Sequence, residues 1–189
     1  MYIPDKKTKR IRPVSVTAGE RQAALRGYAL TLLARREYSS VDLRRKLRYR
    51  LAREALNDDG EKRDADEEAE GLVDAVLDEL IQRQWLSEDR YIDGVLSSRG
   101  HRLSNRALND VLRQAGVDVP LARERIRLWE QENPESLRAK AEYQRKFGTR
   151  SFSGKPADFA RRVRYLIQKG FDDHLAQAIV RADCASGEV

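Results

Sequence analysis

The side chains whose type and spacing indicate a chemistry are clustered arginines and lysines, and that chemistry is anion recognition. Helical spacing over 43–50 places Arg44, Arg45 and Arg48 on one arc, beside an apolar stripe of Leu43 and Leu47. Similar clusters follow later in the chain: Arg99, Arg102 and Arg106, and then Arg145, Lys146, Arg161, Arg162, Arg164 and Lys169. Guanidinium groups bind phosphate or carboxylate, and each neutralised phosphate adds salt-sensitive affinity.

Any single cluster is better explained as a solvated outer face of a helix. The clusters recur, however, in equivalent places three times along the chain, which favours a shared contact surface. Tyr49 lies among arginines and is the aromatic residue that we consider for contact with a base or a partner. We predict that the contact surface consists of Arg44, Arg45, Arg48, Arg99, Arg102, Arg106, Arg145, Arg161, Arg162 and Arg164.

Patterns typical of catalysis or metal binding are missing from the sequence. It contains neither a GxxxxGK phosphate loop nor a dinucleotide fingerprint. His101 and His174 each lack a Cys or a second His at metal-ligand spacing. The carboxylates fall in helix first turns or in one acidic segment, where capping and solvation explain them. We therefore predict no enzymatic activity, no cofactor and no metal.

A helical pattern that occurs three times must position these basic clusters. Each copy reads as an apolar-faced helix, a Gly stop, an apolar residue, an Asp start signal and a second apolar-faced helix. In the last two copies the matching residues are separated by a constant 54 positions, as in Leu112 and Leu166, Gly116 and Gly170, and Asp118 and Asp172. Repeats of this kind are typical of stacked helical units that present an extended surface.

Apolar periodicity places the helices of each copy. We predict helices near 20–37, from Ser39 or Ser40 onward and through 72–85; near 87–100, 104–115 and 118–131; and near 134–147, 156–169 and 172–183. No segment has the alternating pattern of a strand. The expected fold is all-α, an elongated single domain of three tandem three-helix repeats at 20–86, 87–132 and 133–184. Trp85, Trp129, Phe147, Tyr165 and Phe171 are expected in cores or between repeats.

Two segments lie outside this pattern. Residues 1–19 are basic, contain Pro4 and Pro13, and are predicted to be a disordered tail that either contacts phosphates or only aids solubility. Residues 57–70 carry eight acidic and two basic side chains and read as an insertion in the first repeat, partly helical from Asp66. This acidic segment either shields a basic face or, the favoured interpretation, is a tolerated surface insertion.

The composition narrows the class of protein. The 189 residues carry a net charge of +6 and a pI near 9.5, which favours nucleic acid or a partner coated with it. Cys184 is the single cysteine, so an intramolecular disulfide is excluded, as suits a reducing cytosol. No apolar run approaches the roughly 18 residues of a membrane span. We expect a soluble, cytoplasmic protein with no membrane partner.

The same residues resemble the RecX family, regulatory proteins that restrain the bacterial RecA recombinase. Residues 32–47 are similar to the family signature LxxRxxSxxELRxKL, with Asp42 in place of the usual Glu. The resemblance continues through 86–91, Ser98, Arg99 and 108–117, and then through 144–148 and 164–171. The resemblance covers residues 22–182. The chain departs from the family pattern at 102–105, where Arg-Leu-Ser-Asn replaces the Gly-rich turn before the middle helix.

The resemblance implies a curved array of three repeats that lies in the groove of the RecA–single-stranded DNA filament. Such a protein blocks filament growth or promotes disassembly, and it thereby inhibits ATP hydrolysis, strand exchange and co-protease activity. Recombination, DNA repair and the SOS response would be regulated in this way. The expected partners are the RecA filament and single-stranded DNA, met directly or through the filament, and the simplest oligomeric state is a monomer.

Two other hypotheses remain from the residues alone. A stand-alone DNA-binding regulator of helix-turn-helix type would insert the helix capped by Ser39 or Ser104 into the major groove. A general helical scaffold for other proteins would instead bind in a manner insensitive to salt and nucleic acid.

Overall fold

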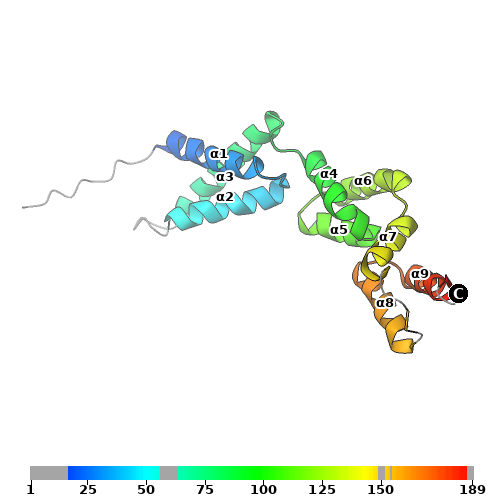
Figure 1. The fold of residues 1–189 in the computed structure, drawn as a ribbon. Helices are drawn as coiled ribbons and strands as arrows, with labels where there is room; N and C mark the ends of the chain where they lie inside the picture. Colours follow the sequence, from blue (N-terminus) through cyan, green and yellow to red (C-terminus); the bar gives the residue numbers. More distant parts are fainter. Residues whose placement is uncertain (1–16, 56–63, 149–151, 154, 187–189) are drawn as a thin grey trace, which may run out of the picture.

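The computed structural model describes residues 17–55, 64–148, 152–153 and 155–186, and this part of the chain is all-α. Nine α-helices and one short 3₁₀ helix, η1, account for its regular structure, and no strand is present in it (Figure 1). The elements are α1 (Ala18–Leu33), α2 (Ser40–Ala55), α3 (Asp64–Gln82), α4 (Glu88–Arg99), η1 (Gly100–Arg102), α5 (Asn105–Gln114), α6 (Val119–Glu132), α7 (Glu135–Phe147), α8 (Pro156–Gln168) and α9 (Asp173–Ser186).

Each group of three consecutive helices encloses a hydrophobic core of its own. Helices α1–α3, which we call repeat 1, bury Leu43 and Val76. Helices α4–α6 form repeat 2 around Ile92 and Leu112, and α7–α9 form repeat 3 around Leu166. Figure 1 shows the repeats in an elongated, bent row, with α2, α5 and α8 along the inner side of the bend. The predicted all-α fold class is confirmed, while the proposed domain limits remain a prediction.

Most helices begin within a few residues of the predicted positions, and in α4, α5 and α6 a side-chain cap marks the start. The side chains of Ser87, Ser104 and Asp118 accept hydrogen bonds from backbone N–H groups three residues further on, as N-caps do. Ser39 plays the same part for α2, since its Oγ accepts from Asp42 N at 3.1 Å.

The prediction of disorder over residues 1–19 is wrong for the last residues of that range. Thr17 and Glu20 form a capping box, in which the Glu20 carboxylate accepts from Thr17 N at 2.8 Å and Thr17 Oγ1 accepts from Glu20 N. This reciprocal pair starts α1 at Ala18, inside the range 1–19. Residues 1–16, which hold the basic side chains of the predicted tail, lie outside the described residues.

The acidic segment 57–70 is helical in its second half. Helix α3 begins at Asp64, two residues before the predicted start at Asp66, and runs for 19 residues. Acidic residues are favoured at the start of a helix because the helix dipole is positive at its N-terminus. Residues 57–63 lie outside the described part of the chain.

The core prediction holds for four of the five aromatic residues and is wrong for Trp85. Trp129 and Tyr165 are half-buried against their cores, and Phe147 and Phe171 are fully buried. Trp85 is 41% exposed, because the chain leaves α3 through a turn at Gln84 whose φ is +56°. The turn points the indole toward solvent, where the Arg83 guanidinium lies over it.

The middle helix of one repeat docks by its N-terminus on a glycine turn of the next repeat. Between repeats 1 and 2, Ser39 Oγ donates to Ala115 O at 2.6 Å. Next to Ala115, Gly116 has a φ of +79°, and a Cβ there would lie 2.5 Å from Val41 Cγ2. Glycine is therefore required at 116 both by the backbone conformation and by the close approach of repeat 1.

The junction between repeats 2 and 3 repeats this device. Ser104 N donates to Lys169 O at 3.1 Å, and a Cβ on Gly170, whose φ is +88°, would lie 2.5 Å from Ser104 Oγ. Each junction adds a glutamate from the first helix of the following repeat. Glu88 accepts from the backbone N–H of residue 40 at 2.7 Å, and Glu135 accepts from that of residue 105 at 3.3 Å. The sequence pattern thus encodes the stacking direction as well as the helices.

Candidate nucleic-acid interface

The arginines of α2 are divided between two flanks of the helix. Arg44 forms ion pairs with Asp74 at 2.5 Å and with Glu70 at 3.6 Å, and Arg48 forms an ion pair with Glu70. Both side chains therefore lie along α3, held by Glu70 at the end of the acidic segment and, for Arg44, also by Asp74 just beyond it. The predicted single arc of Arg44, Arg45 and Arg48 is split, because Arg45 pairs within α2 while the other two pair with α3.

The outward flank of α2 carries Arg45, Lys46 and Tyr49. The side chain of Arg45 is 72% exposed and pairs at 2.8 Å with Asp42, one helical turn earlier. Lys46 is exposed and forms no ion pair with any described residue, and Tyr49 is also exposed. Exposed ion pairs contribute only about 0–1 kcal/mol, so the Asp42 carboxylate can give way to a phosphate at little cost.

Repeat 2 presents its cations at the turn between α4 and α5. Arg99 ends α4, Arg102 lies in η1 and Arg106 lies in the first turn of α5. All three side chains are exposed, and none of them forms an ion pair within the described part of the chain. This basic turn, by which we mean Arg99, Arg102 and Arg106, therefore leaves its full charge available to an external anion.

A buried arginine from the next repeat holds the basic turn in place. Arg138 of α7 is only 4% exposed, and its guanidinium donates to the carbonyl oxygen of Gly100 at 2.9 Å and to that of Leu103. It also donates to Asn105 Oδ1 at 2.5 Å and lies 4.8 Å from the centre of the Trp129 ring. Burial lowers the pKa of the Arg138 guanidinium.

Sequence reasoning did not single out Arg138. The available signal is its position in the buried stripe of α7, where Arg138 and Glu142 alternate with Ala139 and Tyr143 at helical spacing. A charged residue at a core position is costly unless its hydrogen bonds are satisfied, and here backbone carbonyls satisfy them.

The arginines of repeat 3 are mostly engaged within the chain. Arg162 is fully buried, and it donates to Tyr143 Oη at 2.8 Å and to Asp183 at 3.0 Å. Its predicted role in the contact surface does not agree with this position, because the guanidinium does not reach the surface. Arg145 makes a two-pronged pair with Glu142, at 2.7 Å for both hydrogen bonds.

Two further arginines of α8 face outward. Arg161 pairs at 2.5 Å with Asp158, whose pKa is held well below its usual range by hydrogen bonds from Ser153 N and Arg161. Arg164 is exposed and has no ion-pair partner among the described side chains. By the repeat spacing, Arg164 occupies in α8 the position that Arg45 occupies in α2.

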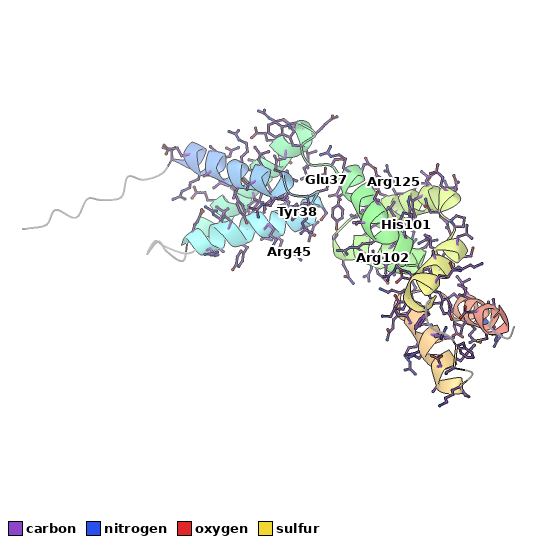
Figure 2. All side chains as sticks on the ribbon, viewed as in Figure 1. Glu37, Tyr38, Arg45, His101, Arg102 and Arg125 are labelled. Atoms are coloured by element: carbon purple, nitrogen blue, oxygen red, sulfur yellow. The ribbon has the colours of Figure 1, made fainter. Side chains whose placement is uncertain are left out.

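The ten predicted contact residues thus fall into three sets. Arg45, Arg99, Arg102, Arg106, Arg161 and Arg164 face solvent; Arg44, Arg48 and Arg145 are held by carboxylates of other elements or of the buried network; and Arg162 is in the core. In Figure 2, Arg45 and Arg102 lie at the lower side of repeats 1 and 2, and repeat 3 extends below them. The geometry therefore suits weak, dispersed binding of anionic groups along an extended surface.

The structure also bears on metal binding and on membrane-spanning helices. Among the described residues, no group of three or more His, Cys, Asp and Glu side chains is placed to hold a metal ion. None of the described helices is long and apolar enough to span a membrane.

Comparison with known proteins gives relatives over most of the chain. No family model matches it. The chain is 32% identical over 148 residues to the "Regulatory protein RecX" of Chromobacterium violaceum, covering 78% of this chain and 83% of that protein. It is 33% identical over 162 residues to the protein of the same name from Ralstonia pickettii, covering 83% and 86%. With that from Neisseria meningitidis serogroup B the identity is 28% over 160 residues, covering 85% and 91%.

Proposed function

The chain belongs to the RecX family of regulatory proteins, and from this premise we propose that it is a negative modulator of the RecA recombinase. It binds in the groove of the RecA–single-stranded DNA filament and inhibits ATP hydrolysis, strand exchange and co-protease activity. Recombination, DNA repair and the SOS response are regulated by this inhibition. The protein acts by binding and not as an enzyme.

The observation that carries the proposal is the basic turn of repeat 2. Its three exposed arginines have no competing carboxylate in the described chain, and buried Arg138 fixes the backbone between them. A backbone segment that is already fixed before binding loses little conformational freedom when its side chains bind a partner. Arg45, Arg161 and Arg164 extend the surface into repeats 1 and 3.

An elongated row of repeats suits a polymeric partner. A filament groove offers the same phosphates and side chains at many successive points, so a bent helical array meets it through several separate contacts. Arg44, Arg48 and Arg145 join these contacts only where a partner displaces their carboxylates, and Arg162 supports repeat 3 from within.

The test is ATP hydrolysis by a preformed RecA filament on single-stranded DNA while this protein is titrated in. Charge reversal at Arg102 and Arg106 should raise the half-inhibitory concentration by about tenfold, because two salt-sensitive contacts are lost. A matched control reverses Arg123 and Arg127, which are exposed on α6 of the same repeat. Equal effects of the two double variants would contradict the assignment of the basic turn.

The same titration separates two modes of inhibition. Full inhibition at amounts well below one protein per recombinase subunit indicates that filament ends are capped. Inhibition that requires near-equal amounts indicates that the groove is coated along its length.

The helix-turn-helix alternative requires the N-terminal turn of a recognition helix to enter the major groove. Ser39 and Ser104 begin the two candidate helices, and both are completely buried against the following repeat. The following repeat therefore covers the capping residue of each helix, while Arg106 in the first turn of α5 stays exposed on another side. Insertion of either helix N-terminus into a major groove would require the repeats to separate. Sequence-specific duplex binding that is independent of recombinase would nevertheless favour this alternative.

A further inference from the structure

Helix α2 presents an outer face that the packing of repeat 1 leaves open. Leu43 and Leu47 point into the core, and Arg44 and Arg48 are held against α3. The residues on the opposite side follow helical spacing and are exposed or half-buried: Asp42, Arg45, Lys46 and Tyr49.

Tyr49 lies on this outer face of α2. Its side chain is 64% exposed, the largest value among the exposed large hydrophobic side chains of the described chain. Two other tyrosine rings of repeat 1 have cations over them: Arg50 lies over half-buried Tyr28, and Arg36 lies over buried Tyr38. No ring contact, cation contact or hydrogen bond to the Tyr49 side chain occurs among the described residues. A planar apolar ring that is left open in this way can accept another ring.

Cations lie beside Tyr49 along the helix. Arg45 is four residues before it and Lys46 three residues before it, so each is about one helical turn away. The single carboxylate on this face, Asp42, makes an exposed ion pair with Arg45 that a phosphate can replace. A ring beside cations matches a base and the phosphate next to it.

We propose that Tyr49 is a stacking platform for a base of single-stranded nucleic acid, and that Arg45 and Lys46 hold the adjacent phosphate. The occupant is single-stranded because the bases of a duplex are stacked on one another and present no free face to the ring. This inference rests on the proposed function and deepens it, since it names the part of the chain that contacts the single strand in the filament.

The test uses the full chain without recombinase and a fluorescently labelled oligodeoxythymidylate, with binding followed by fluorescence anisotropy. Tyr49→Ala should weaken binding by about tenfold, the loss typical of one stacked base, whereas Tyr49→Phe should stay within about twofold of the unaltered chain. Leu137→Ala is the matched control, since Leu137 is 63% exposed but lies on α7. A duplex of the same length should bind Tyr49→Ala and the unaltered chain equally.

Salt dependence distinguishes the ring from its cations. Tyr49→Ala should leave the slope of log affinity against log salt concentration unchanged, while Arg45→Gln should reduce that slope by about one. The proposal is overturned if the unaltered chain does not bind the oligonucleotide, if Tyr49→Ala binds it normally, or if Tyr49→Phe loses as much as Tyr49→Ala. Full inhibition of the recombinase by Tyr49→Ala with normal oligonucleotide binding would overturn this inference and leave the proposed function standing.

Discussion

The packing at the junction between repeats 1 and 2 predicts opposite effects on stability for alanine substitutions at two glycines of repeat 2. Gly116 has a φ of +79°, and an added Cβ would lie 2.5 Å from Val41 Cγ2 and 2.7 Å from Val41 Cβ. Gly94 lies within α4, and a Cβ there would meet no atom within 4 Å. We expect Gly116→Ala to destabilise the protein and Gly94→Ala to stabilise it.

The size of the difference follows from three contributions. A left-handed conformation costs alanine about 1–2 kcal/mol, of which about 0.4–1 kcal/mol is offset because the unfolded chain loses freedom. Relief of the clash with Val41 must move the start of α2, which weakens the hydrogen bond of about 1 kcal/mol between Ser39 Oγ and Ala115 O. The expected loss for Gly116→Ala is therefore about 2 kcal/mol, against a gain of about 0.5–1 kcal/mol for Gly94→Ala.

The assay is urea unfolding followed by helical circular dichroism, combined with small-angle X-ray scattering of the folded variants. Gly116→Ala should unfold at lower urea and, because repeat 1 pivots away from repeat 2, should change the radius of gyration. Gly170→Ala should behave in the same way at the second junction, where the added Cβ approaches Ser104 Oγ and Ala107 Cβ. If Gly116→Ala and Gly94→Ala shift stability in the same direction, the docking argument for the glycine turn is refuted.

Three further predictions follow from the contacts of the site. Arg138→Met should lower the free energy of unfolding by about 2–3 kcal/mol in urea titrations, because buried carbonyl oxygens lose their donor, and Arg138→Lys should not restore it because an ammonium lacks the fork. Glu70→Gln combined with Asp74→Asn should raise affinity for the oligodeoxythymidylate by about two- to tenfold and steepen its salt dependence, because two arginines of α2 are released. Burial raises the pKa of Tyr143 to about 12, so its contribution to stability is complete below about pH 10, where the unfolded chain keeps the proton, and is lost as the pH rises through 12. Urea titrations should show a decline of about 2 kcal/mol across this range that is absent in Tyr143→Phe.

The sequence alone determined the helices, their order and their threefold repetition. Apolar spacing and capping residues such as Ser87, Ser104 and Asp118 act over three or four residues, so their effect does not depend on distant partners. The resemblance to the RecX family was likewise readable from ordered motifs along the chain, and the relatives confirm it.

Only the tertiary structure decided which arginine and lysine side chains are free of internal partners and exposed to an external anion. Helical spacing groups Arg44, Arg45 and Arg48 on one arc, but α3 lies along one flank of that arc and supplies carboxylates more than twenty residues away in the sequence. Arg162 and Arg138 are of the same residue type as the arginines on the surface. Packing nevertheless buries both side chains, and each guanidinium donates hydrogen bonds to groups inside the protein. The physical reason is that helical periodicity fixes the direction in which each side chain leaves its own helix. Which residue it meets in that direction depends on how segments distant in the sequence pack together.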